Sequence, residues 1–134
     1  MGAMSRDKGK AGEREVAREL SLLTGWEVKR KVRQLDGESD LEGVPGWSVE
    51  VKRHAAALPG DIAKWWAQAH AQAAASGPQV VPVLFYRANA RKWRAVFPVG
   101  ILIGKGPQDQ SGYEWTCETS LEAWAAVARE HHAG

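Results

Sequence analysis

The sequence contains a single cysteine, Cys117, among its 134 residues. One cysteine excludes an intramolecular disulfide and a zinc site built on cysteine ligands, so we expect a reducing, cytoplasmic setting. Cys117 itself is best interpreted as a small buried apolar residue.

Long apolar runs are also absent. No stretch approaches the length of a membrane span, and the polar start of the chain has no apolar signal-peptide core, so we expect no membrane partner. A chain of this length fits one domain with a sizeable core. Residues 1–3 precede Met4 and resemble a cloning remnant. We therefore expect a single domain over residues 4–134.

The net charge is small as well. The chain has 18 Lys and Arg against 16 Asp and Glu, and a formal charge of +2 alone indicates no partner. The charges are nevertheless segregated, because residues 29–33 and 87–94 are basic runs without an acid, whereas residues 114–130 are mainly acidic. Such basic runs can hold a phosphate backbone without reading its sequence.

Hydrophobic periodicity predicts the elements. We expect helices at residues 11–23, 61–76 and 121–131, and strands at residues 26–33, from residue 40, and at residues 47–52, 79–86 and 93–99. One or two further strands are expected at residues 101–103 and 113–119, and a basic arm at residues 5–10. This order indicates an α/β fold, a mixed sheet flanked by helices.

The stretch from Asp40 to Lys52 carries the strongest chemical signal. Asp40 precedes a Pro-Gly turn, and Glu50 and Lys52 follow it on an apolar strand. Because strand side chains alternate between faces, Glu50 and Lys52 point the same way. If Asp40 joins them across the turn, two hard oxygen donors lie beside a cation, which suits a divalent metal ion that holds a phosphate.

The length of the turn in this hairpin decides whether Asp40 can lie on the same face as Glu50, so the shared metal site is testable. With a two-residue turn at Pro45 and Gly46, Leu41 would lie opposite Glu50 and Asp40 would point to the wrong face. We therefore predict a three-residue loop or a bulge, which Gly43 or Gly46 could supply.

Two charged residues fall on apolar faces. Glu13 lies three positions before Val16 on the first helix, and Arg30 lies on the apolar side of its strand. Glu13 needs a partner if it is buried, although an acid near a helix N-terminus can also simply favour the dipole. Arg30 needs an acid or a phosphate.

Other polar and aromatic residues are given simpler interpretations. We expect Trp65 and Trp66 to serve as core or dimer contacts rather than as platforms for bases, and we assign no catalytic role to His70. Solvated positions are expected for Gln68, Gln72, Glu15, His131 and His132.

Several blocks of the sequence resemble one enzyme family. Glu13 on a helix, then Asp40, then Glu50-Val-Lys52 match the PD-(D/E)xK nuclease superfamily in order and type. The blocks that resemble archaeal-type Holliday junction resolvases, also found in phages, are Lys8-Gly-Lys-Ala-Gly-Glu13-Arg14-Glu, Gly25-Trp-Glu-Val-Lys-Arg30, Ser39-Asp40-Leu41, Val49-Glu50-Val51-Lys52 and Pro82-Val-Leu-Phe-Tyr-Arg87. The similarity spans about residues 8–99, and the tail from Gly100 lies outside it.

The resemblance implies a fold and an activity. The fold would be restriction-endonuclease-like, a five-stranded mixed sheet flanked by helices, with a C-terminal strand and helix extension at about residues 100–134. The activity would be Mg2+-dependent cleavage of four-way DNA junctions by a homodimer, with Mn2+ expected to substitute. The setting would be a bacterial or archaeal cell, or a phage-infected host.

The resemblance also assigns roles. Asp40 and Glu50 would bind the metal with the Val51 carbonyl, Glu13 directly or through water, and Lys52 would orient or deprotonate the attacking water. A serine near the metal could be Ser39. The residues expected to contact DNA, from the resemblance or from the basic runs, are Lys8, Lys10, Arg14, Lys29, Arg30, Lys31, Arg33, Arg53 and Arg87.

Three other interpretations stay open. The chain could be a nuclease of the same superfamily that acts on flaps, ends or duplex DNA. It could be a non-catalytic nucleic-acid-binding module, although the intact Asp40, Glu50 and Lys52 argue against that. It could also be an α/β domain in which the motif is a coincidence.

Overall fold

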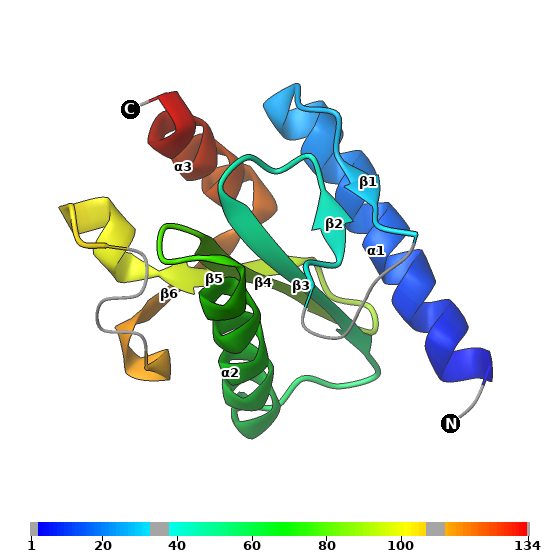
Figure 1. Cartoon of the computed structure of the whole chain (residues 1–134). Helices are drawn as coiled ribbons and strands as arrows, with labels where there is room; N and C mark the ends of the chain where they lie inside the picture. The colour runs from blue at the N-terminus through cyan, green and yellow to red at the C-terminus, as the bar shows by residue number, and fades with distance from the viewer. Residues whose placement is uncertain (1–2, 33–37, 107–111, 134) are drawn as a thin grey trace.

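The structure, a computed structural model, describes residues 3–32, 38–106 and 112–133. The helices are α1 (Ala3–Thr24), α2 (Pro59–Ser76) and α3 (Leu121–Ala133) (Figure 1). The strands are β1 (Lys29–Arg30), β2 (Leu41–Glu42), β3 (Trp47–His54), β4 (Val81–Ala88), β5 (Arg94–Pro98) and β6 (Thr116–Ser120). Two short 3-10 helices are η1 (Val99–Ile103) and η2 (Tyr113–Trp115). Within the described ranges, no helix is long and apolar enough to cross a membrane.

The main sheet is mixed and has four strands in the order β3-β4-β5-β6. β3 and β4 are parallel, and the other neighbours are antiparallel. β1 and β2 form a separate antiparallel pair. The α/β class and the mixed sheet are confirmed, but the sheet is four strands plus a pair rather than five strands. β6, from the segment expected to be an extension, forms one edge of the sheet.

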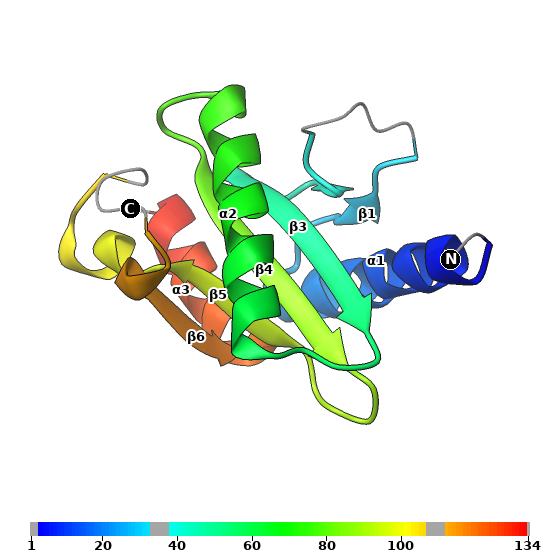
Figure 2. The same ribbon diagram turned by 90° about the horizontal axis from the view of Figure 1, so that it is seen from below.

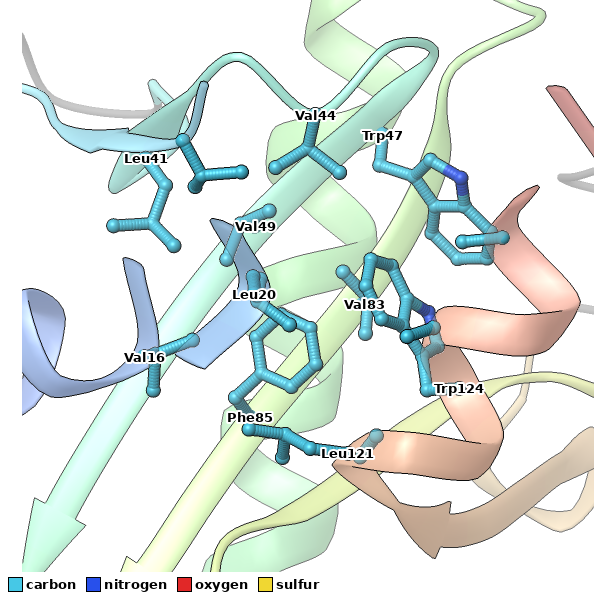
Figure 3. Packing of buried hydrophobic residues seen from close by; sticks show 14 of the residues in the cluster. Val16, Leu20, Leu41, Val44, Trp47, Val49, Val83, Phe85, Leu121 and Trp124 are labelled. Carbon is cyan, nitrogen blue, oxygen red and sulfur yellow. The ribbon is translucent and has the colours of Figure 1, made fainter. Parts of the chain in front are cut away.

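Helices cover both faces of the sheet (Figure 2). On one face, apolar residues of α1 and α3 pack against the odd-numbered residues of the central strands, as Leu20, Phe85 and Trp124 illustrate (Figure 3). On the other face, α2 packs against the even-numbered residues Leu84 and Val96. Strand alternation therefore places Glu50 and Lys52 on the α2 side of β3.

Three predicted elements differ from the structure. The expected arm at residues 5–10 is helical, because α1 already begins at Ala3. The expected strand at residues 26–33 shortens to the two residues that pair with β2, and Val32 is 79% exposed. Residues 101–103 belong to η1, which ends at Gly104 in the left-handed conformation and so does not continue into a strand.

Candidate active site

The connection between β2 and β3 departs from simple hairpin pairing. Pro45 and Gly46 occupy the centre of a turn in which the Trp47 N–H donates to the Val44 carbonyl at 3.2 Å. Gly43 has a φ of +89°, and a Cβ there would lie 2.1 Å from the Glu27 carbonyl oxygen. β2 pairs with β1 and not with β3. The turn therefore has two central residues, and the predicted three-residue loop is wrong; the departure from a regular hairpin lies at Gly43 and in the pairing of β2 with β1.

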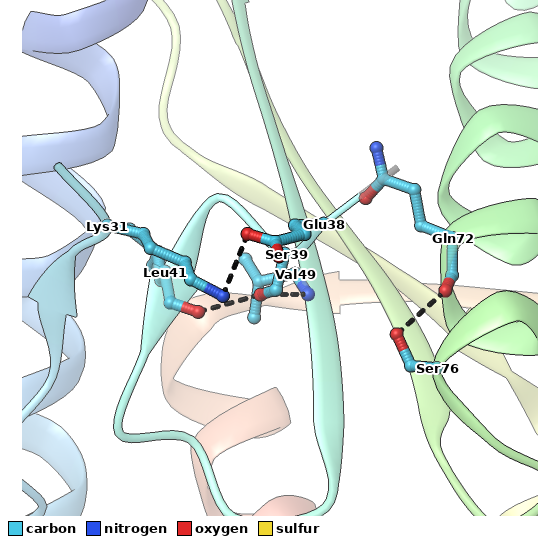
Figure 4. Close-up of polar contacts among 7 residues, drawn as sticks. All are labelled: Lys31, Glu38, Ser39, Leu41, Val49, Gln72 and Ser76. Atoms are coloured by element: carbon cyan, nitrogen blue, oxygen red, sulfur yellow. Dashed lines mark hydrogen bonds and ion pairs between the residues drawn. The ribbon is translucent and has the colours of Figure 1, made fainter. Parts of the chain in front are cut away.

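Backbone and hydroxyl groups fix the position of Asp40 against β3. The Asp40 N–H donates to the Val49 carbonyl at 2.7 Å. Ser39 Oγ accepts from the Val49 N–H at 2.9 Å and donates to the Leu41 carbonyl at 2.7 Å (Figure 4). The Val51 N–H in turn donates to Asp40 Oδ2 at 2.7 Å. These bonds hold Asp40 beside β3, an edge strand of the main sheet, with its Oδ2 atom against the Val51 N–H. Ser39 attaches the same segment to Val49.

Asp40 and Glu50 meet in the interior, where they are only 8% and 3% exposed. Burial is the main cause that raises the pKa of Asp40 from its ordinary value of 3.8 to about 8, and the hydrogen bond to Glu50 and the charge of Glu50 act in the same direction. The Val51 N–H and Lys52 act in the opposite direction. Without a cation, Asp40 therefore favours its protonated form at neutral pH.

A glutamine of α2 holds the second acid. Gln72 is buried, and its Nε2 donates to Glu50 Oε2 at 2.9 Å. The prediction that Gln72 is solvated is wrong, because this face of α2 lies over the polar side of β3. The sequence signal was the pair Gln68 and Gln72, four apart on an otherwise alanine-rich helix, and Gln68 is exposed as predicted.

The two acids open into a pocket of about 560 Å3. Its walls come from α1, the β2–β3 region and α2, and the lining residues are Gly9, Glu13, Asp40, Glu50, Val51, Lys52, Arg53, His54, Ala55 and Gln68. Lys52 has no ion-pair partner among the described residues. Its ammonium group therefore remains available to a phosphate in the pocket.

Glu13 and Arg30, which each needed an opposite charge, are partners of one another. Arg30 Nε lies 2.9 Å from Glu13 Oε1, and both side chains are largely buried. Glu13 thus lies in the pocket wall. Within residues 9–32, 38–106 and 112–133, no three acidic, histidine or cysteine side chains form a cluster that could hold a metal ion.

The donor set nevertheless suits a hard divalent cation. Asp40 and Glu50 supply carboxylate oxygens, and the Val51 carbonyl faces the same edge of β3 as the Val51 N–H that contacts Asp40. Mg2+ keeps several waters and is usually held by only one or two carboxylates, so these residues fit it.

The cations predicted to contact DNA fall into two groups. Ion pairs engage Lys29 with Glu27, Lys31 with Glu38 (Figure 4), Arg30 with Glu13, and both Arg53 and Arg87 with Glu15. Lys10 and Arg14 on α1 are exposed and have no ion-pair partner in the described part of the chain. The Lys8 side chain and Arg33 lie outside the described residues.

Glu15 was expected on the wetter side of its helix, and it is partly exposed but makes contacts that the sequence did not predict. It accepts from Arg53 Nη1 at 3.0 Å, from Trp93 Nε1 at 3.1 Å and from Arg87. These contacts connect α1 to β3, to β4 and to Trp93 just before β5. The basic runs therefore contribute to the fold as well as to the surface.

Comparison with known proteins places this geometry in a family. A family model described as "Phage putative PDDEXK endonuclease" matches residues 4–130. The chain belongs to this family. As a PDDEXK endonuclease, it is a nuclease of the PD-(D/E)xK superfamily, whose members generally use divalent metal ions.

The family match extends into the region after Gly100, which lies outside the similarity to junction resolvases. No curated protein and no solved structure matches the chain significantly.

Proposed function

We propose that this PDDEXK endonuclease is a Mg2+-dependent, structure-selective enzyme that hydrolyses phosphodiesters of branched DNA, four-way junctions above all. One observation carries the proposal. Two buried carboxyl groups, Asp40 and Glu50, meet in a pocket into which Lys52 also projects from the same strand face.

The side chains around the two acids have distinct roles in this proposal. Asp40, Glu50 and the Val51 carbonyl would hold the divalent cation, with Glu13 contributing through water. When bound, the cation supplies a more acidic water and offsets charge on the phosphate. Lys52 orients the attacking water and neutralises the phosphate oxygens. Gln72 fixes the Glu50 carboxylate by the hydrogen bond described above.

The substrate class rests on charge and on the resemblance. Exposed Lys10 and Arg14 lie on the part of α1 that contributes Gly9 and Glu13 to the pocket, and they would bind backbone phosphates without reading sequence. The similarity to junction resolvases supports a four-way junction as substrate. Because such a junction has two symmetric scissile strands, we also propose that the enzyme acts as a two-fold homodimer.

Cleavage assays test the substrate class directly. The protein is incubated with a synthetic four-way junction, a flap and a linear duplex, each with Mg2+ or with EDTA. We expect paired nicks confined to the junction and only with the metal. Preferred cleavage of flaps, ends or duplex would leave a nuclease with a different substrate. Binding without cleavage in either Mg2+ or Mn2+ would support a non-catalytic module instead.

Substitutions of the two acids test the roles. We expect Glu50→Gln and Asp40→Asn to reduce the cleavage rate by at least about 100-fold while junction affinity in EDTA stays within a few-fold, because the carboxylates serve the reaction and not the DNA backbone. The control is Glu42→Gln, an exposed acid on neighbouring β2, which should cleave like the parent protein. Loss of binding together with cleavage would make Asp40 and Glu50 structural.

A further inference from the structure

One ring at the rim of the pocket has no part in the proposed chemistry. His54 is the last residue of β3, and strand alternation puts it on the same face as Glu50 and Lys52. It is exposed and lines the pocket that contains both acids. At roughly 3.3 Å per residue, His54 lies about 13 Å along the strand from Glu50, so it can reach a nucleotide near the reacting one but not the reaction itself.

The imidazole of His54 is stacked on one neighbouring ring. It lies on the indole of Trp65, with ring centroids 4.8 Å apart and planes 23° from parallel. Trp65 projects from α2, is partly buried against the core under that helix, and has Tyr86 as its next ring neighbour at 6.3 Å. The Tyr86 hydroxyl donates to Glu118 Oε1 at 2.9 Å, and this hydrogen bond holds the Tyr86 ring in place.

This arrangement has the properties of a platform for a base. An exposed aromatic ring supported by a second ring stacked against it can stack on a nucleobase, and such stacking tolerates any base because every base has a π face. A base inside an intact duplex is already stacked on its neighbours, and removing it from the helix has a cost. A platform beside a nuclease pocket therefore favours DNA that already presents an unpaired base.

The geometry points to His54, supported by Trp65, as the stacking site for an unpaired nucleobase next to the scissile phosphate. This inference rests on the proposed function and sharpens it, because it makes an unpaired nucleotide at a branch or an end the feature that the enzyme selects. His54 is a binding residue in this scheme, and Trp65 positions it.

A fluorescent base tests the contact without cleavage. Branched DNA with one unpaired 2-aminopurine at the branch, and matched DNA with an abasic site there, are titrated with the protein in EDTA. We expect the protein to quench the 2-aminopurine. His54→Ala should bind the DNA with the unpaired base about 5- to 150-fold more weakly, the range expected for one base stack, and the abasic DNA as the parent does.

Two further variants separate stacking from other roles of His54. His54→Phe keeps a ring and should retain both affinity and quenching, whereas His54→Gln keeps a polar group and should behave like His54→Ala. The matched control is His132→Ala, which removes another exposed histidine that contacts a tryptophan, Trp26, at 5.6 Å. It should change neither measurement. Thermal melts check that each variant is folded.

The outcomes distinguish this inference from the proposed function. If His54→Phe loses as much affinity as His54→Ala, or if the loss is equal on abasic DNA, the stacking site is wrong even for an active nuclease. If quenching and the variant pattern hold but no DNA is cleaved with Mg2+, the stacking site stands and the proposed hydrolysis fails.

Discussion

Asp40 is buried beside Glu50, and this makes the stability of the protein sensitive to pH. In the unfolded chain, Asp40 loses its proton near its ordinary pKa of 3.8, but in the folded protein it keeps the proton up to about pH 8. Folding therefore takes up a proton between these values. Because the unfolded state binds fewer protons there, the free energy of unfolding falls as pH rises through this window.

We predict that metal-free protein loses stability from pH 4 to pH 8 relative to Asp40→Asn, which has no carboxyl group to titrate. Chemical denaturation in EDTA at several pH values measures this difference. Mg2+ should also raise the melting temperature more at pH 8.5 than at pH 6, because the cation must displace the proton that Asp40 holds. Parallel stability curves for the two proteins would contradict the raised pKa of Asp40.

Gln72 is the second residue with a testable effect. It donates to Glu50 Oε2 inside the protein, so Gln72→Ala removes a buried hydrogen bond and frees the carboxylate to turn. We expect metal affinity to fall about 10- to 100-fold, the usual effect of losing a residue that orients a ligand, measured by titrating cleavage and melting temperature with Mg2+. Lys64→Ala, an exposed residue of α2 outside the pocket lining, is the control and should change neither value by more than a few-fold.

Residue patterns in the sequence predicted which face of a helix or strand a side chain lies on better than they predicted its interaction partner. The position of Glu13 and Arg30 on apolar faces indicated that each needed an opposite charge, and the structure pairs them. The same reasoning missed Glu15 and Gln72. Both residues have partners that are distant in the sequence, such as Arg87 for Glu15, and periodicity within one helix carries no information about them.

At the scale of elements, the β2–β3 connection decides whether the site exists. Parity predicted from the sequence that a regular two-residue hairpin would turn Asp40 away from Glu50. The structure keeps a two-residue turn at Pro45 and Gly46, and the connection is irregular because β2 pairs with β1 instead of β3. The sequence could not show how the irregularity is held. Gly43 approaches the Glu27 carbonyl, which belongs to the segment before β1, so the constraint appears only when that segment is in place.

We predict that Gly43→Ala damages this connection far more than Gly46→Ala. Both glycines have positive φ, so each alanine variant should lose about 1–2 kcal/mol of stability from backbone strain. Only at Gly43 would the new Cβ also meet backbone, at 2.1 Å from the Glu27 carbonyl oxygen, whereas nothing lies within 4 Å at Gly46. Gly43→Ala should therefore displace β2 and reduce cleavage as well.

Denaturation and cleavage rates measured on both glycine variants separate the two effects. A Gly46→Ala variant that is mildly destabilised but cleaves normally, beside a Gly43→Ala variant that loses cleavage, supports the close approach as the constraint on Asp40. Equal losses in the two variants would show that left-handed backbone strain alone accounts for the damage.

At the scale of the whole molecule, the segment after Gly100 is part of the main fold. The apolar stripe of the last helix could be read from the sequence, but not the surface that it covers. In the structure, Trp124 of α3 is fully buried, with its ring 5.1 Å from Trp47 and 4.9 Å from Phe85. β6 completes the sheet, and the family match continues to residue 130.

We therefore expect Trp124→Ala to destabilise the entire domain. Removing a fully buried tryptophan costs about 3–5 kcal/mol, so the unfolding midpoint should fall sharply while the transition stays single. Trp115→Ala is the matched control, because Trp115 is 39% exposed, and it should shift stability by less than about 1 kcal/mol. Two transitions in calorimetry would mean that the C-terminal segment folds separately. A Trp124→Ala effect as small as that of the control would mean that this segment contributes little to the core beneath the active site.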